Sequence, residues 1–231
     1  HPIAGVPAPP IDPKVTAAAK KLVDEALAAK GGKAKLAAVK AFRMIAVGTT
    51  TINGQTVPVE IERMFVVPDR MRIDATLAAR VKVTVSVSGK TGWQLAPDPS
   101  GSKVQLTDIG ASDMASIHFE RWREPELILL RAGDAGARLG LGADTIIGGN
   151  SHAVVTVRSP FGGVDVSLFI DKKTKLISRM AYSEGGQAES DEFSGYKDVG
   201  GFKVAHKRHS TGGGRTTDLE FKTVEFDPKV D

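Results

Sequence analysis

The feature that most constrains this chain is a strict alternation of residue types between Val81 and Ser88. Every second residue is valine, and the residues between are lysine, threonine or serine. A period of two puts each residue type on one face of a β-strand, so the segment predicts a strand with one dry and one wet face. The same alternation recurs over most of the chain after residue 42. We therefore expect sequential antiparallel strands that form a sandwich, a barrel or a strongly curved open sheet.

Turn residues separate the alternating segments. Asn53-Gly54 lies between residues 42–51 and 56–67, and both residues tolerate positive φ, which is typical of a tight hairpin. A second series of strands begins near Thr145, and glycine-rich turns join its members. In all, the pattern predicts about ten or eleven strands.

Two stretches depart from the period of two. Asp12-Pro13 is a good helix start, and the apolar residues that follow recur at helical spacing until Gly31-Gly32. Residues 110–132 form a second helical insert, which Pro125 splits or kinks. Glycines 133, 136, 140 and 142 then predict turns before the second series of strands.

Composition excludes several classes of protein. The net charge is +4, and the basic residues are scattered among acidic ones without the aromatic pairs of an RNA-binding surface. No cysteine is present, which excludes disulfides, thiolate metal sites and a cysteine nucleophile. No apolar run approaches the roughly 18 residues of a membrane helix. The glycine run at 212–214 lies between two strands and precedes no helix, so it cannot form a phosphate-binding loop.

The sequence predicts no metal site and no cofactor. His206 and His209 are three residues apart on one predicted strand, which places them on opposite faces. The remaining histidines have no zinc-ligand spacing. The five histidines are His1, His118, His152, His206 and His209.

No catalytic residue is predicted either. Ser88 and Ser194 each precede a glycine, but neither lies in a G-x-S-x-G turn. Glu60 and Glu62 share one face of a strand, where they most simply face water. Asp191 and its neighbour Glu192 form another acidic pair without a base beside it. We therefore interpret the chain as non-catalytic, and an unrecognised enzyme is the remaining alternative.

The apolar surplus of the insert carries the functional hypothesis. In the simpler interpretation, the insert packs on the sheet and closes the core. In the other, it is a lid over a cavity lined by the apolar strand faces. The alternation shifts near Arg63, so the sequence does not determine on which face of the strand Met64 and Val66 lie. The predicted lining comprises Met64, Val66, Met71, Ile73, Val83, Val85, Trp93, Leu95, Ile117, Phe119, Trp122, Leu129, Leu130, Val166 and Leu168.

Three segments together resemble the LolA and LolB lipoprotein-carrier superfamily. Residues 145–157 resemble its hairpin with a central glycine and a V-V-x-V strand. Residues 168–180 resemble its strand, D-x-x-T-x-L, strand hairpin. Residues 193–206 resemble its Y-x-x-V-x-G-x-K-x-P pair, with Ala205 in place of the proline. The resemblance covers nearly the whole chain after residue 12.

This resemblance implies a mainly β, α+β fold: a strongly curved antiparallel half-barrel whose concave face is covered by the N-terminal helix and the insert. Residues 12–231 would then form a single domain. It also implies a periplasmic or otherwise extracytoplasmic protein that binds a lipid, a lipoprotein acyl chain or another apolar molecule. Neither a nucleic acid nor a transmembrane segment is expected.

A closer resemblance is to LolA-like domains at the C-terminal end of some bacterial M16-type zinc peptidase chains. Residues 26–47 resemble the start of those domains, and the proline-rich residues 1–11 are typical of a linker. We therefore expect a processed or excised part of a longer chain. The H-x-x-E-H motif of the peptidases is absent. The resemblance thus implies, as an alternative, an interaction module fused to or cleaved from such a peptidase, whose activity would belong to another domain.

Overall fold

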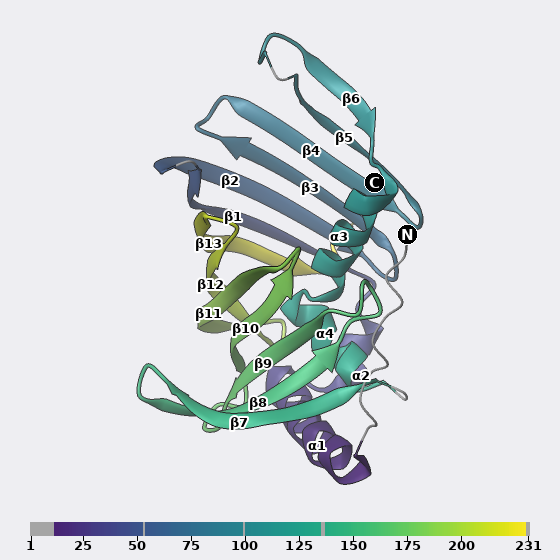
Figure 1. Cartoon of the computed structure of the whole chain (residues 1–231), viewed down its shortest axis with the longest axis vertical. Helices are drawn as coiled ribbons and strands as arrows, with labels where there is room; N and C mark the ends of the chain where they lie inside the picture. Colours follow the sequence, from purple (N-terminus) through teal and green to yellow (C-terminus); the bar gives the residue numbers. More distant parts are fainter. Residues whose placement is uncertain (1–11, 53, 99, 135–136, 230–231) are drawn as a thin grey trace.

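The computed structural model describes residues 12–52, 54–98, 100–134 and 137–229, and residues 1–11 of the expected linker lie outside this part. The described residues form four helices and thirteen strands (Figure 1). The helices are α1 (Pro13–Lys30), α2 (Lys33–Ala38), α3 (Ala111–Trp122) and α4 (Pro125–Ala132). The strands of the first half are β1 (Ala41–Ile52), β2 (Gln55–Val66), β3 (Arg70–Leu77), β4 (Val81–Ser88), β5 (Thr91–Pro97) and β6 (Val104–Asp108). Those of the second half are β7 (Leu139–Ile147), β8 (Asn150–Arg158), β9 (Asp165–Asp171), β10 (Ile177–Glu184), β11 (Gln187–Val199), β12 (Phe202–Gly212) and β13 (Arg215–Phe226).

All thirteen strands belong to one antiparallel sheet. Their order is β6-β5-β4-β3-β2-β1-β13-β12-β11-β10-β9-β8-β7, so the first and last strands of the chain pair in the middle and join two meanders. The edge strands β6 and β7 lie at opposite ends of the molecule, and the sheet stays open (Figure 1). The expected curved, antiparallel half-barrel is therefore confirmed.

The strand count is higher than the ten or eleven expected. Strand β7 also begins at Leu139, before the expected start near Thr145, because Gly140 and Gly142 lie inside this strand rather than in the predicted turns. A Cβ atom on Gly142 would come within 2.9 Å of a Val154 methyl group on β8. Glycine inside a strand often marks such a close approach of two backbones or side chains.

Local rules explain the helix boundaries. The Asp12 carboxylate accepts a hydrogen bond from the Lys14 amide at 2.8 Å, and Pro13 occupies the first turn of α1. At the other end, Gly31 has φ +136°, and the Gly32 amide donates to the Leu27 carbonyl at 2.8 Å. Pro125 begins α4, so the predicted insert is two short helices with a break between them.

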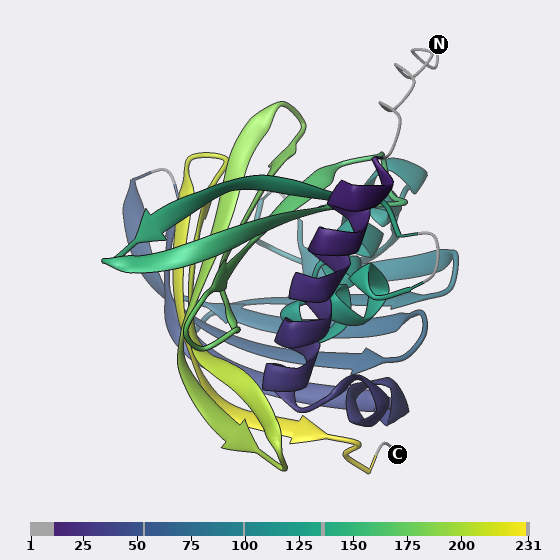
Figure 2. The same ribbon diagram turned by 90° about the horizontal axis from the view of Figure 1, so that it is seen from below.

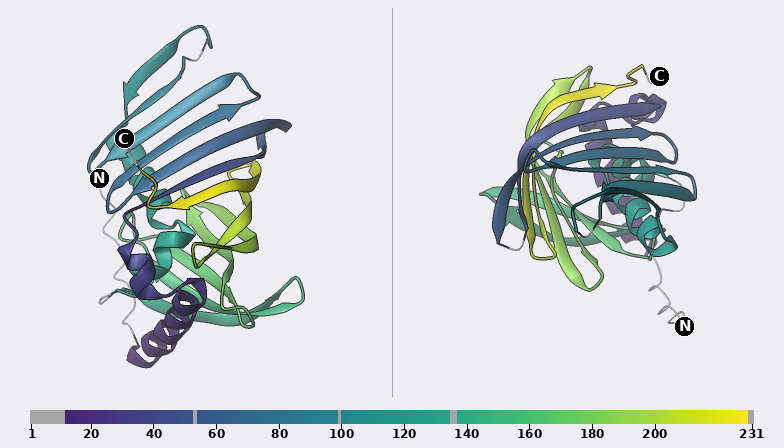
Figure 3. Two further views of the ribbon diagram at one scale, coloured as in Figure 1. Left: turned by 180° about the vertical axis from the view of Figure 1, so that it is seen from behind. Right: turned by 90° about the horizontal axis from the view of Figure 1, so that it is seen from above.

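The helices lie on the concave side of the sheet. Figure 2 shows α1 running across the opening of the curved sheet, and the two views of Figure 3 show the strands bending around the helical layer. Alternate residues of the central strands face this layer, among them Phe42, Met44 and Phe65, which are almost fully buried. Phe119, Ile128 and other insert residues join the same core cluster. The insert therefore closes the core, as the simpler interpretation expected.

Candidate ligand-binding cleft

The fifteen predicted lining residues divide between the two faces of the sheet. On β3 and β4, Met71, Ile73, Val83 and Val85 lie on the concave face, because the Met71–Val87 pair in this register is buried there. The register thus gives the side of the sheet on which these four residues lie. Whether any of the fifteen contacts a ligand stays a prediction.

Four of the fifteen lie on the convex face instead. Arg63 and Phe65 of β2 face the helices, so Met64 and Val66 point the other way. On β5, a Cβ atom on Gly92 would lie 2.9 Å from the Met114 sulfur of α3, which puts Trp93 and Leu95 on the opposite face. The predicted position of these four under the insert is therefore corrected. Alternation identifies a strand, but its phase is set by contacts such as these.

Most of the other predicted residues fill the core. Phe119, Trp122, Leu129, Val166 and Leu168 are buried. Ile117 and Leu130 are half-buried and pack against the same cluster. Of all fifteen, only Ile73, Trp122 and Leu130 also border one of the larger hollows described below.

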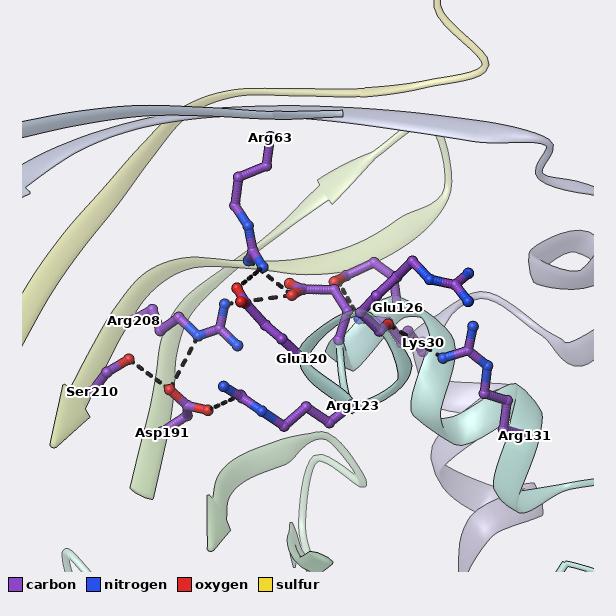
Figure 4. A network of polar contacts seen from close by, with 11 residues as sticks. Lys30, Arg63, Glu120, Arg123, Glu126, Arg131, Asp191, Arg208 and Ser210 are labelled. Atoms are coloured by element: carbon purple, nitrogen blue, oxygen red, sulfur yellow. Dashed lines mark hydrogen bonds and ion pairs between the residues drawn. The ribbon is translucent and has the colours of Figure 1, made fainter. Parts of the chain in front are cut away.

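The hollow between the concave face and the insert holds about 370 Å³ and is strongly polar. Its walls carry an ionic network (Figure 4). Arg63 of β2 binds Glu120 of α3 and Glu124 at the α3–α4 junction, each at 2.8 Å. Arg208 of β12 lies 3.5 Å from Glu124 and 3.4 Å from Asp191 of β11. The expected apolar cavity under the insert is therefore replaced by charged groups.

Two further contacts complete this network. Arg123 pairs with Asp191 at 2.6 Å, and the Ser210 hydroxyl donates to the same carboxylate at 2.5 Å. Burial alone would raise the pKa of Glu124 and of Asp191, but the surrounding guanidinium groups hold both pKa values below their usual range. Each buried charge thus has a partner, and the network ties the insert to strands from both halves of the sheet.

A larger hollow is a cleft of about 850 Å³ at one rim of the half-barrel, on the other side of the insert. Such a volume is in the range of small-molecule binding sites. Helices α2, α3 and α4 border it, together with the β2–β3 turn and the end of β8. Its apolar wall comprises Ala37, Val67, Pro68, Trp122, Leu127, Leu130, Ala137, Val157, Pro160 and Phe161.

The cleft adjoins a smaller void of about 50 Å³ beneath α2. The two hollows share Ala37, Val67, Leu127 and Leu130 as lining residues. Phe42 and Phe226 lie at the inner end of this void. The cleft therefore has a mostly apolar extension toward the core, in which Glu126, paired with Lys30, is the charged lining residue.

Cationic side chains surround the same cleft. Lys33, Arg121, Arg131, Arg138 and Arg158 border it, whereas Asp134 is its one acidic lining residue among those described. Arg121 and Arg131 are the most enclosed of these arginines: Arg121 lies near the end of α3, and the guanidinium of Arg131, from the last turn of α4, bonds the carbonyls there. Burial, together with repulsion from Arg121, lowers the pKa of Arg131 to about 10, and Asp134 opposes this shift. Burial also lowers the pKa of Arg121, against the attraction of Asp69.

The histidines of β12 and Asp191 of the acidic pair singled out in the sequence have other partners in the structure. No group of three or more histidine, cysteine, aspartate or glutamate side chains among the described residues could hold a metal. His206 bonds the Phe221 carbonyl at 2.8 Å, and His209 lies 2.6 Å from Asp218. Asp191, which the sequence showed only as part of an acidic pair, proves to be the buried partner of two arginines. No helix in the described part of the chain is long and apolar enough to cross a membrane.

Comparison with known proteins identifies the fold. A domain named for outer membrane lipoprotein sorting, from Vibrio parahaemolyticus, aligns with a TM-score of 0.55 at 12% identity, over 94% of this chain and 95% of that one. A DUF1329 family protein from Desulfovibrio piger aligns with a TM-score of 0.60 at 13% identity, over 94% and 95% of the two chains. A LolA superfamily protein from Nitrosomonas europaea aligns with a TM-score of 0.57 at 11% identity, over 92% and 94%.

At these identities the likeness concerns the fold alone. The chain thus has the LolA-like half-barrel fold over nearly its full length, as its hairpin motifs implied. No family model matches the sequence, and no curated protein matches it either.

Proposed function

We propose that this chain is a non-catalytic, extracytoplasmic binding domain that holds a lipid, a lipoprotein acyl chain or a similar apolar molecule. The site is the 850 Å³ cleft at the rim of the half-barrel. The observation that carries the proposal is the apolar wall that Trp122, Leu127 and Leu130 of the insert present to this cleft. Concave, mostly apolar pockets with a few polar groups are the usual form of small-molecule sites.

The position of the site differs from the one expected from the sequence. A hydrocarbon chain in the hollow under the insert would contact the charged groups of Arg63, Arg208 and Asp191. Hydrocarbon there would displace the water that solvates the remaining polar atoms of these ions, which is unfavourable even for paired charges. The rim cleft has no such carboxylate–arginine network, and its extension under α2 is mostly apolar, with Glu126 as the one charged lining residue among those described.

The extracytoplasmic location rests on the likeness of fold to lipoprotein-sorting proteins. The alternative, an interaction module of an M16-type peptidase chain, rests on the resemblance of residues 26–47, on the linker-like composition of residues 1–11 and on the absence of catalytic motifs from the sequence. Mixing the purified domain with such a peptidase domain and measuring complex formation by size-exclusion chromatography tests this alternative. A stable complex supports it, and separate elution of the two proteins contradicts it.

A matched pair of substitutions in α2 tests the proposed site. Ala37 and Ala38 are both exposed alanines, but only Ala37 borders the cleft. Ala37→Trp should fill part of the cleft, whereas Ala38→Trp is the control. The probe is the neutral apolar dye N-phenyl-1-naphthylamine, followed by its fluorescence.

We expect saturable binding to the parent protein and to Ala38→Trp. In Ala37→Trp, the indole should prevent the cleft from burying a part of the dye about as large as two methylene groups. The affinity of this variant for the dye should therefore be weaker by roughly tenfold. Equal affinity of the two variants would contradict the proposed site. Absence of saturable binding to the folded parent protein would contradict the proposed function itself.

A further inference from the structure

The charged residues that line the rim cleft are almost all basic. Five basic residues against one acidic residue give its lining a formal charge of +4, which equals the net charge of the whole chain. A cleft lined by one sign of charge and bordered by apolar walls focuses the electrostatic field on its opening. Of the three hollows described above, this cleft is therefore the one whose lining carries a net positive charge.

Two of these cations, Lys33 and Arg158, are engaged by a carbonyl and by a carboxylate, respectively. Arg158 pairs with Asp165 at 3.3 Å across the β8–β9 ladder. Lys33 donates to the Gly133 carbonyl at 2.8 Å, just after α4 ends. Both contribute to the positive field of the cleft, and Arg158 has its counter-charge on the protein.

Arg121 and Arg131 have spare donors. One terminal nitrogen of Arg131 donates to the carbonyls of Trp122, at 2.6 Å, and of Arg121, at 3.2 Å. A terminal nitrogen of Arg121 donates to the Pro68 carbonyl, and its Nε is buried without a partner. A guanidinium has five N–H donors, so both groups can still bind an anion. In the part of the chain that the structure describes, neither forms an ion pair with a carboxylate.

The contrast with the hollow on the other side of the insert is informative. There, Arg63, Arg123 and Arg208 each have a carboxylate within 3.5 Å. Burying a guanidinium without a counter-charge is costly, and a chain that only needed these arginines for structure could supply one. The rim cleft instead has enclosed arginines beside an apolar wall.

We infer that the ligand of the rim cleft is an anionic single-chain amphiphile. Its carboxylate or phosphate head would bind Arg121, Arg131 and the exposed Arg138, and its hydrocarbon tail would lie against Trp122, Leu127 and Leu130. The planar donors of arginine match both head groups, which can accept two parallel hydrogen bonds. The inference deepens the proposed function and depends on it.

A structural role for the arginines is the competing explanation. Arg131 caps the end of α3, where the carbonyls at a helix C-terminus favour a cation. That role needs no ligand and does not involve Arg138, which is exposed and borders the cleft. Arg138 is therefore the residue that separates the two explanations.

The experiment compares probes that share one tail. Dodecanoate and dodecyl phosphate carry the anionic heads, dodecanol is neutral, and inorganic phosphate has no tail. Isothermal titration calorimetry measures each with the parent protein, with Arg138→Glu and with Arg80→Glu. Arg80 is an exposed arginine in the β3–β4 turn, away from the cleft, so its variant makes the same change of charge as a control.

We expect both anionic probes to bind about tenfold or more tightly than dodecanol, as one charge-assisted hydrogen bond would give. Arg138→Glu should remove most of that advantage without affecting dodecanol, and Arg80→Glu should leave all affinities unchanged. The inference is overturned if dodecanol binds as tightly as dodecanoate, or if the two variants behave alike. It is also overturned if inorganic phosphate binds as tightly as dodecyl phosphate, because the tail would then contribute nothing. In the first two cases the proposed apolar site survives, whereas failure of every tailed probe would refute that site as well.

Discussion

Neutralising Glu124 should destabilise the protein more than any exposed ion pair could. Glu124 is fully buried and lies 2.8 Å from Arg63 and 3.5 Å from Arg208. The network holds three guanidinium groups, of Arg63, Arg123 and Arg208, and three carboxylates, of Glu120, Glu124 and Asp191. Glu124→Gln keeps the shape of the side chain but leaves one buried positive charge without compensation.

The expected magnitude follows from burial. Breaking a buried ion pair by removing one partner costs about 3–5 kcal/mol. In a domain of this size, each kcal/mol corresponds to roughly 2–4 °C in Tm, so Glu124→Gln should lower Tm by about 6–20 °C. The matched control is Glu62→Gln, which breaks the 2.6 Å Arg43–Glu62 pair on the convex face. Because the Glu62 side chain is 40% exposed, its loss should stay below about 1 kcal/mol.

Urea unfolding followed by circular dichroism measures both free energies, and differential scanning calorimetry measures both Tm values. A retained m-value would show that the variants unfold from the same compact state. Comparable, small losses for the two variants would refute the reasoning. They would mean that the guanidinium groups of Arg63 and Arg208 reach water or another acceptor when Glu124 is neutral.

Two further predictions concern acid sensitivity and the α1–α2 turn. Because the pKa values of Glu124 and Asp191 are lowered in the folded state, the unfolded chain binds more protons in acid. The stability that these two carboxylates contribute should therefore be fully present above about pH 5 and decline as the pH falls through and below about 4, and Glu124→Gln should show a smaller decline in urea titrations at stepped pH. At the turn, a Cβ atom on Gly31 would lie 2.6 Å from the Gly201 carbonyl oxygen, whereas one on Gly32 would meet nothing within 4 Å. Both glycines have positive φ, so Gly32→Ala should cost about 1–3 kcal/mol of stability through backbone strain alone. Gly31→Ala should cost distinctly more, because its Cβ atom would also meet the Gly201 carbonyl. Equal losses of Tm in the two variants would contradict the close approach of Gly31 to Gly201.

The sequence predicts the fold well because local rules determine most of its elements. Alternation places Val81–Ser88 in β4, Asp12 caps α1, and Pro125 divides the insert. The phase of a strand is harder to predict, because Met64 and Arg63 exchange faces if the register moves by one residue. An arginine in a half-apolar strand can face inward when a distant carboxylate meets it.

The site could be predicted only in part, for the same physical reason. The partners of Arg63 are 57 and 61 residues away, so no local spacing reveals the network. Nor does local sequence show that Arg121 and Arg131 would face an apolar cleft without a carboxylate partner. The many apolar residues around Trp122 can be recognised in the sequence and indicate that the insert takes part in the site. They do not indicate on which of its two sides the insert borders an apolar cleft.

Photo-crosslinking with a diazirine-tailed dodecanoate tests the central claim most directly. After irradiation, peptide mass spectrometry locates the residues that the tail contacts. The account predicts adducts on the wall of the rim cleft, at Trp122, Leu127 or Leu130, which excess dodecanoate removes. Competed adducts at Ile73 and Leu219 in the hollow under the insert, or at Trp93 and Leu95 on the convex face, would contradict it.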